Sequence, residues 1–175
     1  MRIAYFASSA IPSQKANSIQ VIKMCNAFSE LGHEVTLFAK SSENSNNCSI
    51  NKLKEYYGIK NSFELYTLSA SNIRLLGGLE YGYKVYKKIT DLKIDFDIFY
   101  GRNLYALTFC QNFNRPLIYE SHAKPSPGRK ILENHLFSNC PNKTDNKEQY
   151  YYLYQYPFAR LVWNKHERIY SFSNC

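Results

Sequence analysis

Short apolar runs alternate with polar segments along the first 39 residues, and the pattern predicts one strand–helix–strand unit. The run from Arg2 to Ala7 is apolar and rich in strand formers, which is typical of a strand buried on both faces of a parallel sheet. After a polar loop, apolar side chains at spacings of three and four predict a helix capped by Ser18 and ended by Gly32. Val35 to Ala39 then reads as a second short strand.

The same alternation continues downstream. It predicts strands at Phe63 to Leu68, Asp97 to Tyr100 and Pro116 to Glu120, and helices at Lys52 to Tyr57, Ile73 to Thr90 and Leu104 to Asn112. In the Ile73 to Thr90 helix, three glycines weaken the pattern, and the side chains expected to be buried are Leu75, Leu76, Leu79, Tyr83 and Tyr86. Strands that alternate with helices predict an α/β fold, with a doubly wound parallel sheet of the Rossmann-like kind.

This order extends to about residue 137. We therefore expect one domain over residues 1–137 and an atypical tail over residues 138–175, where aromatic residues are dense but follow no period. A chain of 175 residues is long enough for one α/β core and too short for two.

Charge and composition limit the partners, metal sites and cellular location that we expect for the protein. Lys and Arg outnumber Asp and Glu by 22 to 14, a net charge of +8 that favours anionic partners such as phosphorylated ligands or lipid headgroups. The basic residues are scattered, however, as on a solvated surface, and nucleic acid is not an expected partner. The five cysteines show no metal-ligand spacing, so no metal site is predicted. Without a long apolar run or a signal peptide, the expected location is the cytoplasm, with peripheral contact to the inner face of the membrane as an option.

Open parallel sheets bind ligands beyond the carboxyl ends of their strands, so the residues that follow the predicted strands are the candidate site. These residues are Ser9, Gln14, Lys15, Asn17 and Ser18 after the first strand, Arg102 and Asn103 after the fourth, and Glu120, Ser121 and His122 after the fifth. The first loop places Lys15 and backbone donors at a helix N-terminus, which suits a phosphate or carboxylate. It contains no glycine, which excludes a dinucleotide fingerprint or a P-loop, and a solvated connector is the alternative.

The other two segments also allow two interpretations. Arg102 can pair with a bound anion, or it can be an exposed side chain beside Asn103 as a helix cap. Glu120 and His122 can orient each other or hydrogen-bond a sugar hydroxyl, although a histidine at a strand end is more often structural.

Three segments in order carry a family resemblance: RIAYFASSAIPSQKANSIQVIKMCNAFSELGHEVTLFA, DIFYGRNLYAL and PLIYESHAKPSPGRKILENHLF. Together they resemble the N-terminal domain of a GT-B-fold glycosyltransferase of the family 4 type, over residues 1 to about 137. The resemblance implies two Rossmann-like domains that face each other across a cleft. The N-terminal one recognises the acceptor, and the C-terminal one holds most of the nucleotide-sugar. The sugar is transferred with retention of configuration and without a further cofactor.

The resemblance also implies residue roles. Asn17 and Ser18 stand where many members have paired glycines near the donor phosphates, a departure that weakens the case for phosphate contact by this loop. His122 matches the family histidine expected to hydrogen-bond the transferred sugar and to support the developing oxocarbenium charge. We expect this half to be inactive alone, or active with a separate C-terminal donor-binding subunit, in making or decorating a surface polysaccharide or lipopolysaccharide.

Two other function classes stay open. One is a non-catalytic binding module for an anionic acceptor or a membrane surface. The other is a flavodoxin-like or signalling domain, although Ser8 and Ser9 stand where a signalling domain has its acidic cluster.

Overall fold

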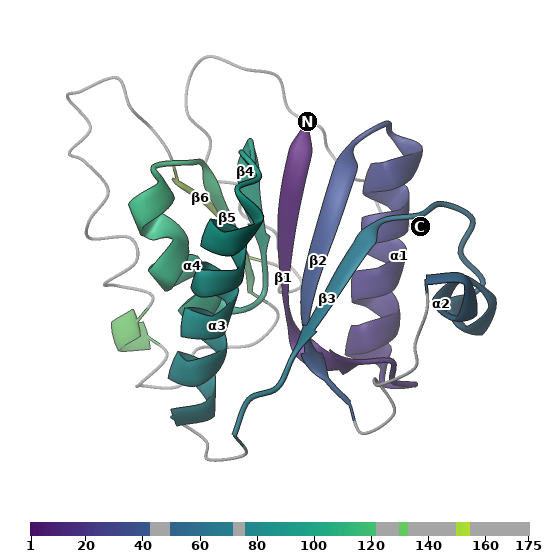
Figure 1. Ribbon diagram of the computed structural model, residues 1–175, viewed down its shortest axis with the longest axis horizontal. Helices are drawn as coiled ribbons and strands as arrows, with labels where there is room; N and C mark the ends of the chain where they lie inside the picture. The colour runs from purple at the N-terminus through teal and green to yellow at the C-terminus, as the bar shows by residue number, and fades with distance from the viewer. Residues whose placement is uncertain (43–49, 72–75, 122–129, 133–149, 155–175) are drawn as a thin grey trace.

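The computed structural model describes residues 1–42, 50–71, 76–121, 130–132 and 150–154, and it confirms the predicted α/β fold. An all-parallel sheet of six strands in the order β3-β2-β1-β4-β5-β6 has helices on both faces (Figure 1). The elements are β1 Arg2–Ile11, α1 Ala16–Glu30, β2 Glu34–Ser41, α2 Ile50–Tyr57, β3 Glu64–Leu68, α3 Leu76–Leu92, β4 Ile98–Gly101, α4 Leu104–Cys110, a 3₁₀ turn at Gln111–Phe113, β5 Leu117–Ser121 and β6 Tyr150–Tyr154. This strand order is that of the Rossmann fold. From β1 the chain adds strands on one side as far as β3 and then on the other side from β4 to β6, so the order of the strands reverses between β1 and β4.

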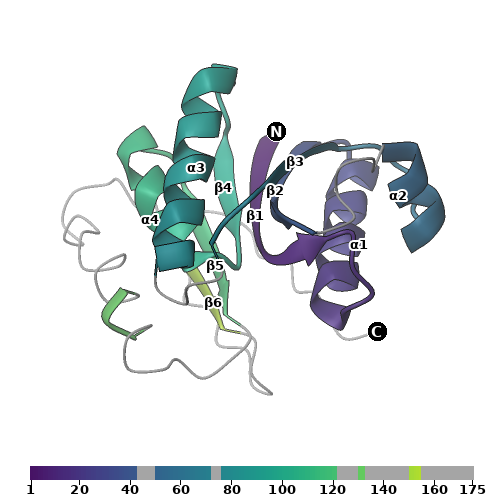
Figure 2. The ribbon, with the colours of Figure 1, turned by 60° about the horizontal axis from the view of Figure 1, so that its bottom comes forward.

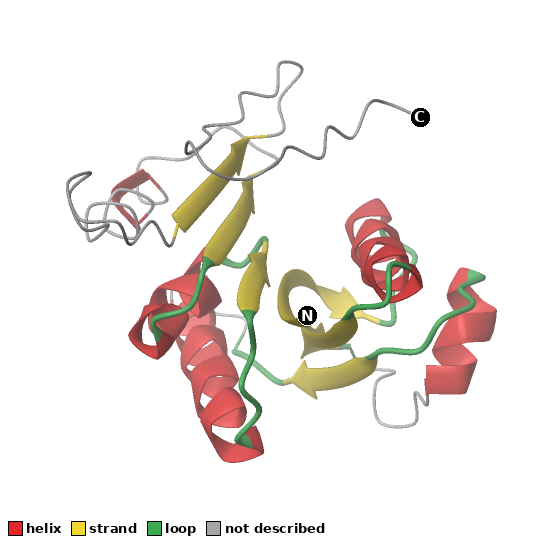
Figure 3. Ribbon diagram, turned by 90° about the horizontal axis from the view of Figure 1, so that it is seen from above, coloured by secondary structure: helices red, strands yellow, loops and turns green. Residues whose placement is uncertain are grey.

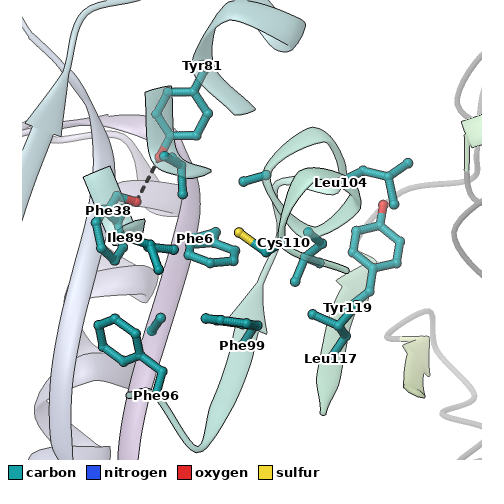
Figure 4. Close-up of a cluster of buried hydrophobic side chains, with 14 residues drawn as sticks. Phe6, Phe38, Tyr81, Ile89, Phe96, Phe99, Leu104, Cys110, Leu117 and Tyr119 are labelled. Carbon is teal, nitrogen blue, oxygen red and sulfur yellow. Dashed lines mark hydrogen bonds between the residues drawn. The ribbon is translucent and has the colours of Figure 1, made fainter. Parts of the chain in front are cut away.

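The central strand β1 is buried on both faces, as its apolar composition predicts. Ala4 and Phe6 lie in a core cluster under α3 and α4, whereas Tyr5 and Ala7 lie in a second cluster under α1 and α2. Figure 4 shows the first cluster, in which the Tyr81 hydroxyl donates a hydrogen bond of 2.9 Å to the carbonyl oxygen of Phe38. The two cores place α3 and α4 on one side of the sheet and α1 and α2 on the other (Figure 3).

The strand β1 is longer than its apolar run predicts. Phe6 pairs with Phe38 and Ala10 with Lys40, so residues 7–9 of β1 lie opposite the single residue Ala39 of β2. Such an irregularity bends a strand and is common near functional sites, because it changes the direction of side chains. Here it lies toward the carboxyl end of β1, where Ser8 and Ser9 stand.

Three of the five side chains predicted to be buried on α3 are exposed, whereas Tyr86 is half-buried beside the Phe113 ring and Leu75 lies outside the described residues. Leu76, Leu79 and Tyr83 are exposed by 56%, 42% and 55%, and the buried large side chains are Tyr81, Val85 and Ile89. The reason is the helix pair α3 and α4, which pack at glycines that the sequence pattern treats as breaks.

A Cβ atom at Gly78 would lie 2.5 Å from the Tyr105 ring, and one at Gly82 would lie 2.9 Å from the Tyr105 carbonyl group. The two helices can therefore approach this closely only through glycine, and the glycine face of α3 turns inward. No helix in the described part of the chain combines the length and hydropathy that a membrane-spanning helix requires.

The element β6 was not predicted, because its residues lie in the expected tail. It pairs in parallel with β5, from Leu117 opposite Tyr150 to Ser121 opposite Tyr154. The rest of the tail lies outside the described residues, so the predicted division at residue 137 stays a prediction.

Candidate functional site at the carboxyl edge of the sheet

A buried ion pair joins the carboxyl ends of β4 and β5. The guanidinium of Arg102, which follows β4, donates from Nη2 to Glu120 Oε1 at 2.9 Å and from Nε to Glu120 Oε2 at 3.0 Å. The exposed fractions of these residues are only 8% and 1%. This two-point geometry fixes the relative position of both side chains, because the planar guanidinium matches the two carboxylate oxygens.

Two tyrosine hydroxyls also donate hydrogen bonds to the Glu120 carboxylate. Tyr5 and Tyr100 lie opposite each other on β1 and β4, and both donate to Glu120 Oε2, at 3.3 and 3.2 Å. Burial and the nearby charge of Glu120 raise the pKa of both tyrosines above the ordinary value, so their hydroxyls remain protonated donors. Burial alone would lower the pKa of Arg102, but its contacts with Glu120 raise it, and the guanidinium stays charged.

The remaining end of the guanidinium reaches the helix after β1. Arg102 Nη1 donates to Asn17 Oδ1 at 2.6 Å and to Gln20 Oε1 at 3.3 Å, and both acceptors lie in the first turns of α1. The Ser8 hydroxyl donates to the carbonyl oxygen of Arg102 at 3.1 Å. Three strand ends and one helix therefore meet at Arg102, at the point where the strand order reverses.

Arg102 was predicted either to pair with a bound anion or to be exposed. The structure buries it, and the anion it pairs with is the carboxylate of Glu120. Asn103 caps α4, which confirms one of the two interpretations of this segment: its side-chain oxygen accepts a hydrogen bond from the Ala106 amide at 3.0 Å. His122 lies outside the described residues, and Ser121 is described only as the last residue of β5.

The loop between β1 and α1 is held from several sides. The Ser13 amide donates to the Tyr57 hydroxyl oxygen at 2.6 Å, and that hydroxyl donates to the Ser13 carbonyl oxygen at 2.8 Å. Ser18 was predicted to cap α1, which is wrong: the helix begins at Ala16, and the buried Ser18 hydroxyl donates to the carbonyl oxygen of Ala10 at 3.1 Å.

Several predicted site residues face solvent at this edge. Gln14, Lys15 and Asn17 are exposed, and they follow one another closely at the start of α1. The Ser9 hydroxyl is buried and has no hydrogen-bond partner within the described part of the chain. A buried hydroxyl without a partner is uncommon in folded proteins, and this one lies in the irregular segment of β1.

The sequence did not identify Tyr5, Tyr100, Gln20 or Tyr57 as part of this edge. Tyr5 and Tyr100 follow the pattern of buried strands, and the available signal was their hydroxyl groups, which need partners when buried. The described residues contain no group of three or more His, Cys, Asp or Glu side chains that could hold a metal ion.

Comparison with known proteins finds similarity only among solved structures, and that similarity concerns the fold. No protein-family model and no curated protein sequence matches the chain. Among solved structures, a sucrose-phosphate synthase from Thermosynechococcus elongatus is similar with a TM-score of 0.58, at 15% identity over 79% of this chain and 40% of that protein. At this identity the similarity shows the fold alone.

Two other solved structures have TM-scores below 0.5. A glycosyltransferase from Rickettsia africae ESF-5 has a TM-score of 0.49, at 10% identity over 78% of this chain and 34% of that protein. The C-terminal domain of a hydrogenase from Pyrococcus furiosus has a TM-score of 0.45, at 13% identity over 66% of this chain and 87% of that one. The chain spans two fifths of the length of the sucrose-phosphate synthase, with which it shares a Rossmann-like fold.

The first prediction concerns the buried ion pair. Replacement Glu120→Gln should destabilise the protein by about 3–5 kcal/mol, because it leaves the buried charge of Arg102 without its counter-charge. The double variant Arg102→Met/Glu120→Leu should lose less, since it removes both charges, although Tyr5 and Tyr100 still lose their acceptor. Urea unfolding followed by circular dichroism measures both. As a control, Asp95→Asn in the exposed Arg115–Asp95 pair should change stability little. Equal losses for Glu120→Gln and Asp95→Asn would contradict a buried, paired carboxylate.

The second prediction concerns the loop. Tyr57→Phe removes the hydroxyl that binds both backbone groups of Ser13 and keeps the ring, and it should cost about 1–2 kcal/mol locally. Amide hydrogen exchange at Ser13 and Lys15 should therefore become faster. The matched control is Tyr56→Phe, since Tyr56 is the neighbouring tyrosine of α2 and is 51% exposed. The same exchange rates in both variants would show that the hydroxyl does not hold the loop.

Proposed function

We propose that the chain is the acceptor-side half of a family 4-like GT-B glycosyltransferase. It takes part in moving a sugar from a nucleotide-sugar to a glycan or lipid acceptor with retention of configuration. The observation that supports this most is the six-stranded parallel sheet, in which the strand order reverses between β1 and β4. Polar side chains line the carboxyl edge at that point, and the loop after β1 contains no glycine. The similarity in fold to a sucrose-phosphate synthase over 79% of the chain is consistent with it.

The chemistry of the edge suits a ligand rich in hydroxyl groups. Gln14 and Asn17 carry amide groups that can both donate and accept hydrogen bonds, and Lys15 adds a positive charge at the start of α1. Arg102 holds Asn17 Oδ1, so this amide presents its nitrogen as a donor.

His122 has the catalytic role in this proposal. It follows Ser121, the last residue of β5, and so comes directly after the strand that carries Glu120. In the transition state it would hydrogen-bond the transferred sugar and stabilise its positive charge. A second Rossmann-like domain, in the same or a separate polypeptide, would supply the contacts to the nucleotide.

The acceptor part of this proposal is testable with the chain alone. In NMR titrations with maltotriose and glucose 6-phosphate, the amides of residues 9 and 14–17 should shift in a saturable manner. Gln14→Ala/Lys15→Ala should weaken that binding about tenfold, because two hydrogen-bonding side chains are lost. Lys23→Ala removes an exposed charge further along α1 and should leave it unchanged. Shifts confined to the opposite edge, or saturable binding of flavin mononucleotide without a response to sugars, would contradict the proposal.

The catalytic part requires the active enzyme with its donor-binding half. There His122→Ala should lower kcat at least about tenfold with little change in stability, because it removes a group that acts on the transition state. Thermal unfolding monitors stability. Unchanged turnover in a folded variant would remove His122 from the site.

A further inference from the structure

A cavity of about 410 Å³ opens at the amino edge of the sheet, the edge opposite the candidate site. Arg2, Glu34 and Glu64, the first residues of β1, β2 and β3, line it. Figures 1 and 2 mark the start of β1 at this edge with N. Sites for small molecules commonly enclose about 300–1,000 Å³, so the cavity has room for a small organic ligand.

The strand register places the charged side chains of the cavity on one face of the sheet. Arg2 lies opposite Glu34 in the β1–β2 pair, and Thr36 lies opposite Glu64 in the β2–β3 pair. Residues two apart on a strand point to the same face, and paired residues on neighbouring strands share a face. This is the face under α3 and α4, because Phe38, two residues after Thr36, belongs to the core cluster there.

Apolar side chains from the connection between α3 and β4 form another part of the cavity wall. Phe96 is buried in the core cluster under α3 and α4, and Ile94 is half-buried against the same cluster. Both side chains are therefore held in place before any ligand arrives. A preformed apolar wall with a few charged groups beside it is the usual composition of a site for a small organic molecule.

The charged groups of the cavity do not pair with one another. Among the described residues the Arg2 guanidinium makes no hydrogen bond or ion pair, although Glu34 lies opposite it. The Glu34 carboxylate has no partner there either, and Glu64 Oε2 accepts only a long hydrogen bond of 3.4 Å, from the Thr36 hydroxyl. Donors and acceptors on both sides of the cavity therefore remain available to a ligand.

Asp97 is the nearest acid on the other side of Arg2, but it is bound to the backbone. Its Oδ2 accepts a hydrogen bond of 2.6 Å from the Arg2 amide. That bond lowers the pKa of Asp97, and the charge of Arg2 adds to the effect without forming an ion pair. The guanidinium therefore keeps its own donors for another carboxylate.

We propose that this cavity binds a free α-amino acid with an apolar side chain. Arg2 binds the carboxylate, because a planar guanidinium can donate to both of its oxygens. Glu34 and Glu64 accept hydrogen bonds from the ammonium group, and the ligand side chain lies on Ile94 and Phe96.

Two other ligand classes fit the same cavity less well. A simple amine would contact the glutamates but leave the Arg2 guanidinium without a carboxylate. A calcium ion takes about six to eight oxygen ligands, whereas the described lining offers two carboxylates beside a positive charge and an apolar wall.

The cavity and the candidate site lie at opposite edges of one parallel sheet. Strand β1 spans the distance between them, with Arg2 at its start and Ser8 and Ser9 toward its carboxyl end. A ligand in the cavity therefore leaves the candidate site unoccupied. The proposal does not rest on the proposed function, and each can fail without the other.

The experiment is an NMR titration of the chain with L-leucine. The amides of residues 2, 34–36, 62–64 and 94–96 should shift in a saturable manner. Two analogues each lack one charged group: isocaproate has no amine, and isoamylamine has no carboxylate. Each should bind at least about tenfold more weakly than leucine, because it leaves charged groups of the cavity without a partner. Glycine should also bind more weakly, because it lacks the apolar side chain.

Two substitutions separate the roles of the charges. Arg2→Gln should weaken leucine binding about tenfold without weakening isoamylamine binding, because only leucine has a carboxylate. Glu64→Gln should weaken both, because both carry the ammonium group. The matched control is Glu55→Gln, which changes an exposed acid on α2 outside the cavity and should leave leucine binding unchanged. Thermal unfolding checks that each variant is folded, and the analogues test the proposal on the unmodified chain.

The proposal is overturned if leucine causes no saturable shifts, or if it shifts only residues of the carboxyl edge. It is also overturned if isocaproate or isoamylamine binds as tightly as leucine, since one of the two charged contacts would then be missing. Equal losses for Glu55→Gln and Glu64→Gln would overturn it as well.

Discussion

The buried pair Arg102–Glu120 is the interaction that the carboxyl edge of this protein depends on. Removing two charges from water is costly, and their attraction offsets that cost only when the remaining donors and acceptors are satisfied. Here Tyr5 and Tyr100 donate hydrogen bonds to the carboxylate of Glu120, and Asn17 accepts one from the guanidinium of Arg102. Such a pair adds little net stability. However, any arrangement that separates its members leaves a buried charge, and this penalty keeps three strand ends and α1 in one geometry.

That geometry explains how a loop without glycine can still be part of a site. A glycine-rich loop lets phosphate approach the backbone closely, whereas here side chains occupy the start of α1. The Asn17 oxygen is bound by Arg102, and the Ser18 hydroxyl by Ala10. With Tyr57 holding Ser13, the loop is positioned before any ligand arrives, which lowers the ordering cost of binding. Recognition by side chains therefore suits this edge better than a backbone phosphate cradle.

The sequence predicts the order of strands and helices well, because buried parallel strands and amphipathic helices differ in period. The glycine that ends α1 can also be predicted from the sequence, and Gly32 has a positive φ of 81° there. Side-chain partners are harder to predict, because they depend on contacts between residues distant in sequence. Arg102 meets Glu120 only through β4 and β5, and it meets Asn17 only through the β1–β4 pairing. For α3, the leucines indicate burial, but glycines facing Tyr105 decide the orientation instead.

The packing of α3 on α4 also decides which side chains of α3 face solvent. Because Gly78 and Gly82 must face α4, Leu76, Leu79 and Tyr83 have no route to the core, and their exposure follows from the α3–α4 contact. The candidate site lies at the carboxyl edge, whereas α3 covers one face of the sheet. The opposite face is covered by α1 and α2, which include the residues that hold the edge loop. The side chains that hold this loop therefore come from the α1 and α2 face of the sheet, which, in the proposed function, leaves the edge open to an acceptor and to a donor-binding domain.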